Sequence, residues 1–130
     1  MLPAALPGTM APVNRRSVVE LFSNLVTRPT GRAIRTGVES QIAEMEEGGP
    51  AVRLSILDFS QVRVLDYSCA DEVVAKLLLR FRGEERPADV YFLARGLHEH
   101  HIDPIEEVLE RHGLLLVAQD EAGEAHLLGD

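Results

Sequence analysis

The chain has 130 residues, enough for one domain with a hydrophobic core, and its 45% hydrophobic and 26% charged residues are typical of a globular protein. Thirteen basic against 21 acidic residues give a net charge of -8, which disfavours nucleic acid as a ligand, as does the absence of tryptophan. The single cysteine, Cys69, excludes an internal disulfide and a multi-cysteine zinc site and fits a reducing compartment.

Residues 1–13 are predicted to form a disordered tail ahead of a domain that spans residues 14–130. Pro3 and Pro7 interrupt the short apolar run of this tail, and no basic residue precedes it, so the stretch is a poor secretory signal. No other segment approaches the apolar length that a membrane span requires. We therefore expect a cytoplasmic protein that does not bind a membrane.

The segment from residue 17 to residue 26 is compatible with either a helix or a strand. Ser17 and Glu20 have the spacing of a helix capping box, but the β-branched content suits an edge strand equally well. Residues 30–45 are predicted to form a helix that ends at Gly48-Gly49-Pro50. Its apolar stripe consists of Ile34, Val38, Ile42 and Met45.

Three arginines, Arg28, Arg32 and Arg35, lie at or near the start of this helix. They could recognise a phosphate or an acidic partner. They could equally form the solvated face of the helix, which is the more common role of such residues.

The middle of the chain predicts two βα units. Residues 52–59 form a short apolar run, typical of a central strand that is covered on both faces of a sheet. After a connection over residues 60–66, a second helix is expected to end at Gly83. Its core-facing stripe consists of Ala70, Val73, Val74, Leu77, Leu78 and Phe81.

The last part of the chain predicts a strand at residues 90–93, a helix and a hairpin. Asp103 and Pro104 have the pattern of an N-cap followed by an N1 proline, and the helix should end near Gly113. Residues 114–118 and 124–128 flank a turn that contains glycine. The predicted fold is an α/β sandwich, in which helices pack against a small mixed sheet that ends in a C-terminal β-hairpin.

The stretch LSILDFSQVRVLDYSCADEVVAKLL, at residues 54–78, resembles the STAS domain, the fold of bacterial anti-sigma-factor antagonists. That family commonly carries Asp-Ser-Ser-Gly where this chain has Asp66, Tyr67, Ser68 and Cys69, so the second serine is kept and the glycine is lost. The run from Ser68 to Glu72 is closer to a poorly characterised STAS-like family with a Ser-aromatic-Ala-Asp-Glu motif. The likeness covers roughly residues 17–113, and the terminal hairpin departs from the usual STAS pattern.

The resemblance implies a regulatory module that binds another protein, such as an ATP-binding anti-sigma factor or a histidine-kinase-type protein, without a cofactor or catalysis. Ser68 would be the phosphorylated switch. The expected partner-binding residues are Asp66, Tyr67, Ser68, Asp71 and Glu72. A serine at a helix start can also be a plain N-cap, and the neighbouring acids would oppose a phosphate.

The alternative function is a small enzyme that depends on a metal or on cysteine. Cys69 could pair with a histidine, although a small packed thiol is the simpler reading of a lone cysteine without a basic neighbour in sequence. His98, His100 and His112 are weak candidates for zinc ligands, because imidazole binds zinc but a solvated loop explains the same run of histidines.

Overall fold

The computed structural model describes residues 15–44, 53–86 and 89–129, so the predicted tail and Gly48-Gly49-Pro50 lie outside the described residues. Strands and helices alternate along the chain. In chain order they are β1 (Arg15–Leu25), α1 (Arg28–Glu44), β2 (Arg53–Leu65), α2 (Tyr67–Ala70), the π-helix η1 (Asp71–Ala75), α3 (Lys76–Arg80), β3 (Val90–Leu97), α4 (Glu99–His112), β4 (Leu115–Asp120) and β5 (Ala125–Gly129).

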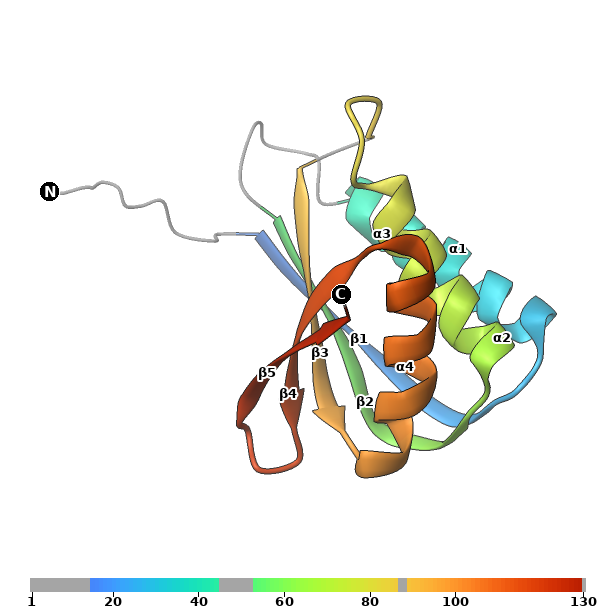
Figure 1. Ribbon diagram of the computed structural model, residues 1–130. Helices are drawn as coiled ribbons and strands as arrows, with labels where there is room; N and C mark the ends of the chain where they lie inside the picture. The colour runs from blue at the N-terminus through green and yellow to red at the C-terminus, as the bar shows by residue number, and fades with distance from the viewer. Residues whose placement is uncertain (1–14, 45–52, 87–88, 130) are drawn as a thin grey trace, which may run out of the picture.

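The five strands form one sheet in the order β1-β2-β3-β4-β5. The first four strands run parallel, and β5 pairs with β4 in an antiparallel hairpin. Because the strand order follows the chain order, crossovers of the usual right hand all pass over the same face of the sheet. Figure 1 accordingly shows the helices of the described chain on one side of the sheet. The predicted α/β class, with a small mixed sheet and a C-terminal hairpin, is confirmed.

The core lies between this helix layer and the sheet. Leu57 and Phe59 of β2 are completely buried, as are Leu77 of α3 and Ile105 of α4. These side chains belong to one continuous cluster, and burial of each large apolar side chain contributes roughly 1.5–3 kcal/mol to folding. The stripe predicted for residues 70–81 therefore does face the core.

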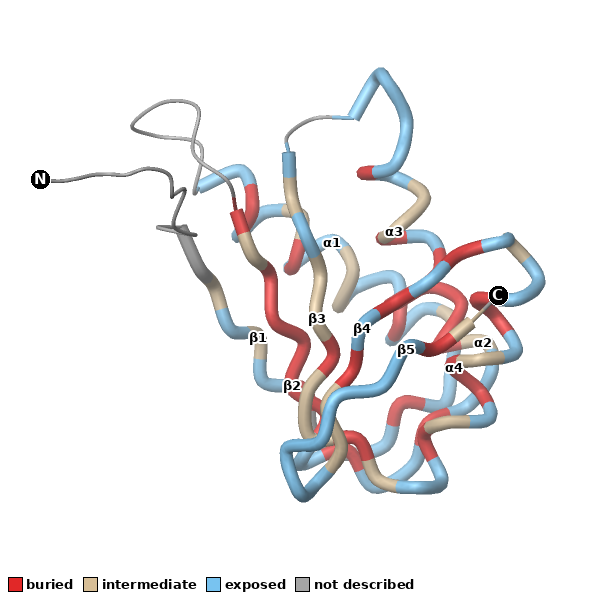
Figure 2. The backbone as a smooth tube through the Cα atoms, turned by 60° about the vertical axis from the view of Figure 1, so that its left-hand side comes forward, coloured by how far each residue is buried: buried red, intermediate tan, exposed pale blue. Residues whose placement is uncertain are grey.

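The other face of the sheet carries no helix within the described ranges, which corrects the prediction that β2 is covered on both faces. One row of apolar residues crosses this face in register: Val18, Ile56, Leu93, Val117 and Leu127. In Figure 2, exposed segments alternate with buried or intermediate ones along β1 and β4, whereas most of β5 is exposed. Ile56, with a strand on either side of it, is nevertheless buried.

The structure decides between the two alternatives for residues 17–26, and two other strands are longer than predicted. Residues 17–26 belong mostly to β1, so the strand alternative holds. β2 continues through Leu65, where a connection was predicted, because β1 pairs with it as far as Leu25 and because Val62 and Leu65 keep burying side chains. β3 likewise extends to Leu97, beyond the predicted residues 90–93.

Three helix boundaries also differ. The first helix begins at Arg28, before the predicted start at residue 30. The second helix ends at Arg80 and not at Gly83. The last helix begins at Glu99 with His98 as its N-cap, so the predicted start at Asp103 and Pro104 is wrong and Pro104 lies inside the helix. His101 explains the earlier start, because its Nδ1 accepts a hydrogen bond from the backbone N–H of His98 at 3.1 Å.

Candidate functional site

The junction between β2 and α2 lies at the carboxyl edge of the parallel strands. The backbone N–H of Asp66 donates to the carbonyl of Leu25 at 2.8 Å, which ties the ends of β1 and β2 together. Asp66 is the N-cap of α2 in an extended conformation, so Ser68 lies inside the helix and is not its N-cap. The Ser68 hydroxyl donates instead to the Asp66 carboxylate at 3.0 Å. Asp66 and Tyr67 are exposed and Ser68 is half-buried.

Three large apolar side chains are exposed around this junction, and we call them the carboxyl-edge patch. They are Val26, which is 43% exposed, Val64, 45%, and Tyr67, 47%. Val26 follows the end of β1, Val64 is near the end of β2, and Tyr67 begins α2. Because Leu25 and Leu65 are register partners, the three positions lie at the same edge of the sheet. Ligands and partners of parallel sheets usually bind at this edge.

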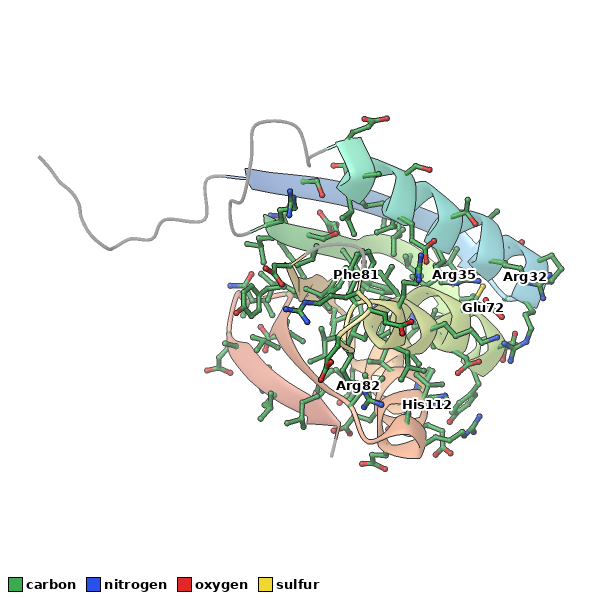
Figure 3. The ribbon with its side chains drawn as sticks, turned by 90° about the horizontal axis from the view of Figure 1, so that it is seen from above. Arg32, Arg35, Glu72, Phe81, Arg82 and His112 are labelled. Carbon is green, nitrogen blue, oxygen red and sulfur yellow. The ribbon has the colours of Figure 1, made fainter. Side chains whose placement is uncertain are left out.

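Glu72 is fully buried in η1 and holds the strongest cluster of charges in the helix layer. Its carboxylate forms ion pairs with Arg28 at 2.7 Å, with Lys76 at 2.9 Å and with Arg35 at 3.4 Å. Burial alone would raise the pKa of Glu72, but hydrogen bonds from Lys76 and Arg28 outweigh it and lower that pKa to about 2. Figure 3 shows Glu72 and Arg35 side by side.

Asp71 extends this cluster to the last helix. Its carboxylate bonds to Arg28 at 2.9 Å and to His112, at the end of α4, at 3.2 Å. Burial would raise the pKa of Asp71, whereas the hydrogen bonds from Arg28 and His112 lower it overall. The structure therefore places Asp71 and Glu72 in an ion-pair network that joins α1, η1 and α4, and leaves Asp66, Tyr67 and Ser68 at the accessible edge.

Cys69 is a packed thiol. It is fully buried, its Sγ donates to the carbonyl of Thr27 at 3.0 Å, and burial raises the pKa of the thiol. A nucleophilic cysteine needs the opposite, a lowered pKa and access to a substrate. The histidine rings bond elsewhere, to Ser60, Val62, Arg63, Glu121, Asp71 and Asp120.

The histidines at the start of α4 fasten that helix to β2. His100 Nε2 donates to the carbonyl of Arg63 at 2.8 Å. His101 is completely buried, and its Nε2 donates to the carbonyl of Val62 at 3.0 Å while its Nδ1 accepts from His98. Both bonds require the same neutral tautomer, and burial lowers the pKa of His101 to about 4.

The pKa of His98 is shifted in the opposite direction to that of His101. Its ring nitrogens face two acceptors, the carbonyl of Ser60 and the carboxylate of Glu121. The hydrogen bond to Ser60 and then the contact with Glu121 raise the pKa of His98. Because both ring nitrogens of His98 already contact oxygen atoms, neither is free to bind a zinc ion.

The three candidate zinc ligands are not gathered into one site. The rings of His98 and His100 are stacked with centroids 5.8 Å apart, but His112 lies at the opposite end of a helix of 14 residues. Another group was not anticipated from the sequence: ligand atoms of Asp120, Glu124 and His126 lie within 4.8 Å of one another at the β4–β5 turn. There the Asp120 carboxylate accepts from the backbone N–H groups of Ala122 and Glu124, which explains its position through the turn itself.

The cations of the Glu72 network were also missed as a group. Glu72 and Lys76 have the i,i+4 spacing of a helical ion pair, which the sequence does reveal. Arg28 lies 43 and 44 residues from its two acidic partners, and only the fold brings them together. Among the three arginines considered from the sequence, Arg28 and Arg35 join the network and Arg32 is exposed.

The fold and the junction thus define a singly wound α/β domain with a polar and apolar patch at its carboxyl edge. No protein-family model matches the chain, and no curated protein and no solved structure is significantly similar to it. Among the described residues, no helix has the length and apolar character needed to cross a membrane.

Proposed function

We propose that this domain is a regulatory module that binds another protein through the carboxyl-edge patch and the adjacent Asp66 and Ser68. The observation that carries the proposal is the exposure of Val26, Val64 and Tyr67 at one rigid edge, beside a polar pair at a helix start. Apolar and aromatic anchors surrounded by polar groups are typical of protein interfaces. The packed Cys69 thiol favours this reading over cysteine-dependent catalysis.

Phosphorylation of Ser68 would switch this interface off. A phosphate on Ser68 would break the hydrogen bond with Asp66 and add about -1.5 to -2 charges next to that carboxylate. Ser68 is three residues before Asp71 and four before Glu72 in the sequence, and these two acids open the π-helix that follows α2. Arg28, which pairs with both acids, is the cation that a phosphate there would compete for.

The resemblance to anti-sigma-factor antagonists supplies the proposed context. The partner would be an ATP-binding anti-sigma factor or a histidine-kinase-type protein in the cytoplasm. A net charge of -8 supports a protein partner in preference to nucleic acid.

A pull-down from the source cell tests the proposal, with the parent chain and single variants as bait. Ser68→Ala should recover the same prey as the parent, because it removes only one hydrogen bond at a half-exposed site, at a cost of about 0.5–1 kcal/mol. Ser68→Asp and Tyr67→Ala should lose that prey. Tyr91→Ala is the matched control, because Tyr91 is an exposed tyrosine on the open sheet face.

Circular dichroism would first establish that all four variants are folded. Equal recovery of the same prey by every variant would show that the junction is an ordinary helix start, and the proposal would have to be abandoned.

A further inference from the structure

Strands β3 and β4 separate toward their amino ends. Their pairing runs through Leu93 and Val117, Ala94 and Ala118, and Leu97 and Asp120. On the other side, β2 and β3 are paired from Arg53 and Val90 onward, so it is β4 that diverges. Figure 2 shows the two strands parting in this direction. The sheet therefore opens between residues 90–92 and residues 114–116.

A cavity of about 420 Å³ occupies this opening, and we call it the β3–β4 cavity. Its volume lies in the range of sites that hold small organic ligands, roughly 300–1,000 Å³. Its walls come from the end of α3, from β3 and from the chain after α4. They include Leu78, Phe81, Phe92, Leu114, Leu116 and Leu127.

The chemistry of these walls is apolar with one exception. Among the lining residues that the structure describes, Arg82 is the one that carries a charge, and it is exposed, so its guanidinium stands at the boundary with solvent. It lies 3.5 Å from the carbonyl of His112, and Figure 3 shows the two residues next to each other. A guanidinium has five N–H donors, so this one contact leaves donors available for an anion.

We propose that the β3–β4 cavity binds a small amphipathic anion, an unbranched acyl chain whose carboxylate pairs with Arg82. Charge complementarity selects the head group, because Arg82 is the only ionic group that residues 15–44, 53–86 and 89–129 contribute to the cavity and a carboxylate matches the guanidinium fork. The apolar walls select the tail, because each buried methylene contributes through removal from water. This site is distinct from the carboxyl-edge patch, which lies at the other end of the parallel strands.

The fluorescence of Tyr91 can report on ligand binding in this cavity. The chain has two tyrosines and no tryptophan, and Tyr91 lines the cavity whereas Tyr67 lies at the partner-binding junction. In a Tyr67→Phe background, tyrosine emission therefore comes from Tyr91 alone. Decanoate is the probe, used below its micelle concentration. Decanol has the same chain length but no carboxylate, so it tests the role of the head group. Butyrate keeps the carboxylate on a shorter chain, so it tests the role of the chain.

We expect decanoate to change the Tyr91 emission in a saturable way and to give a measurable heat of binding in titration calorimetry. The affinity for butyrate should be at least tenfold lower than that for decanoate. Arg82→Gln should weaken decanoate binding about tenfold and leave decanol unchanged, and Arg80→Gln, an exposed arginine of α3 outside the cavity, should have no effect. No saturable change in Tyr91 emission, decanol binding as tightly as decanoate, or equal affinity in the parent and Arg82→Gln would overturn the proposal. None of these results depends on the partner protein.

Discussion

A β-carbon on Gly31 would lie 2.9 Å from the Cβ of Glu72, closer than side chains pack in folded proteins. Gly31 is buried in the first turn of α1, and the same added β-carbon would lie 3.1 Å from the Cα and 3.2 Å from the Sγ of Cys69. The missing side chain at this position lets α1 approach η1 closely enough for Arg28 and Arg35 to reach Glu72. The absence of a side chain at Gly31 therefore permits the close helix contact on which the ion-pair network depends.

This contact predicts opposite effects for two glycines of the same helix. Gly31→Ala should destabilise the protein by about 1–3 kcal/mol, because the extra methyl group forces apart packed atoms. Gly37→Ala should stabilise it by about 0.5–1 kcal/mol, because nothing lies within 4 Å of its added Cβ and alanine favours the helix. Urea denaturation of both variants measures the difference, and two changes of the same sign would contradict this packing.

Substitution of Glu72 tests the network itself. Glu72→Gln should cost about 1–3 kcal/mol, less than a fully buried pair, because its cations remain partly exposed to solvent. Glu39→Gln is the control, since Glu39 pairs with Arg35 at 3.2 Å nearer the surface and should cost under about 0.5 kcal/mol.

The lowered pKa of Glu72 also fixes the pH at which its contribution disappears. Its pKa is about 2 in the fold against an ordinary value of 4.5, so the stabilisation is complete above pH 4.5 and is lost as the pH falls toward 2. The stability difference between the parent and Glu72→Gln, measured by denaturation at several pH values, should shrink over that window. A constant difference from pH 6 to pH 3 would show that the ionised carboxylate is not what stabilises the fold.

His101 predicts a second, separate pH window. The pKa of His101 is about 4 in the folded state, below the ordinary 6.5. The folded state therefore takes up this proton only at a lower pH than the unfolded state does, and the protein loses stability as the pH falls from about 6.5 to 4. The raised pKa of His98 acts with the opposite sign, because it adds stability below pH 6.5. The contributions of His101 and His98 can be separated by measuring the stability of the parent and of His101→Phe at several pH values, because this variant keeps His98.

His101→Phe should be less stable than the parent at pH 7.5, because the carbonyl of Val62 and the N–H of His98 lose their partners. The stability difference between the two proteins should then narrow toward pH 5. Parallel stability curves for parent and variant would contradict a neutral, buried His101.

The sequence predicted the helices and strands well where apolar periodicity and turn residues agreed, as in the terminal hairpin and the stripe that ends at Phe81. It missed the start of α4, because the side chains of His98 and His101 set that boundary while Pro104 imitates an N1 proline. It also missed the bare face of the sheet. Ile56 lies on that face yet is buried between its neighbours, so β2 looks apolar on both sides.

The candidate site was only partly predictable. Asp66, Tyr67 and Ser68 could be placed between a strand and a helix from the sequence, although the predicted strand ended at residue 59 and β2 runs through Leu65. Val26 joins them through the β1–β2 register, and Asp71 and Glu72 turn toward basic side chains supplied by α1, α3 and α4. Such long-range pairings depend on how the layers close and leave no local pattern in the sequence.

Site-specific photo-crosslinking in the source cell tests the central claim, that the partner binds at the carboxyl edge. A photoreactive phenylalanine analogue would replace Tyr67 in one protein and Tyr91 in another, since these tyrosines are 47% and 66% exposed on different surfaces. We expect one covalent adduct of defined mass from position 67 and no such adduct from position 91. The adduct from position 67 should disappear when Ser68→Asp is added. The same adduct from position 91 alone, or from neither position, would contradict it.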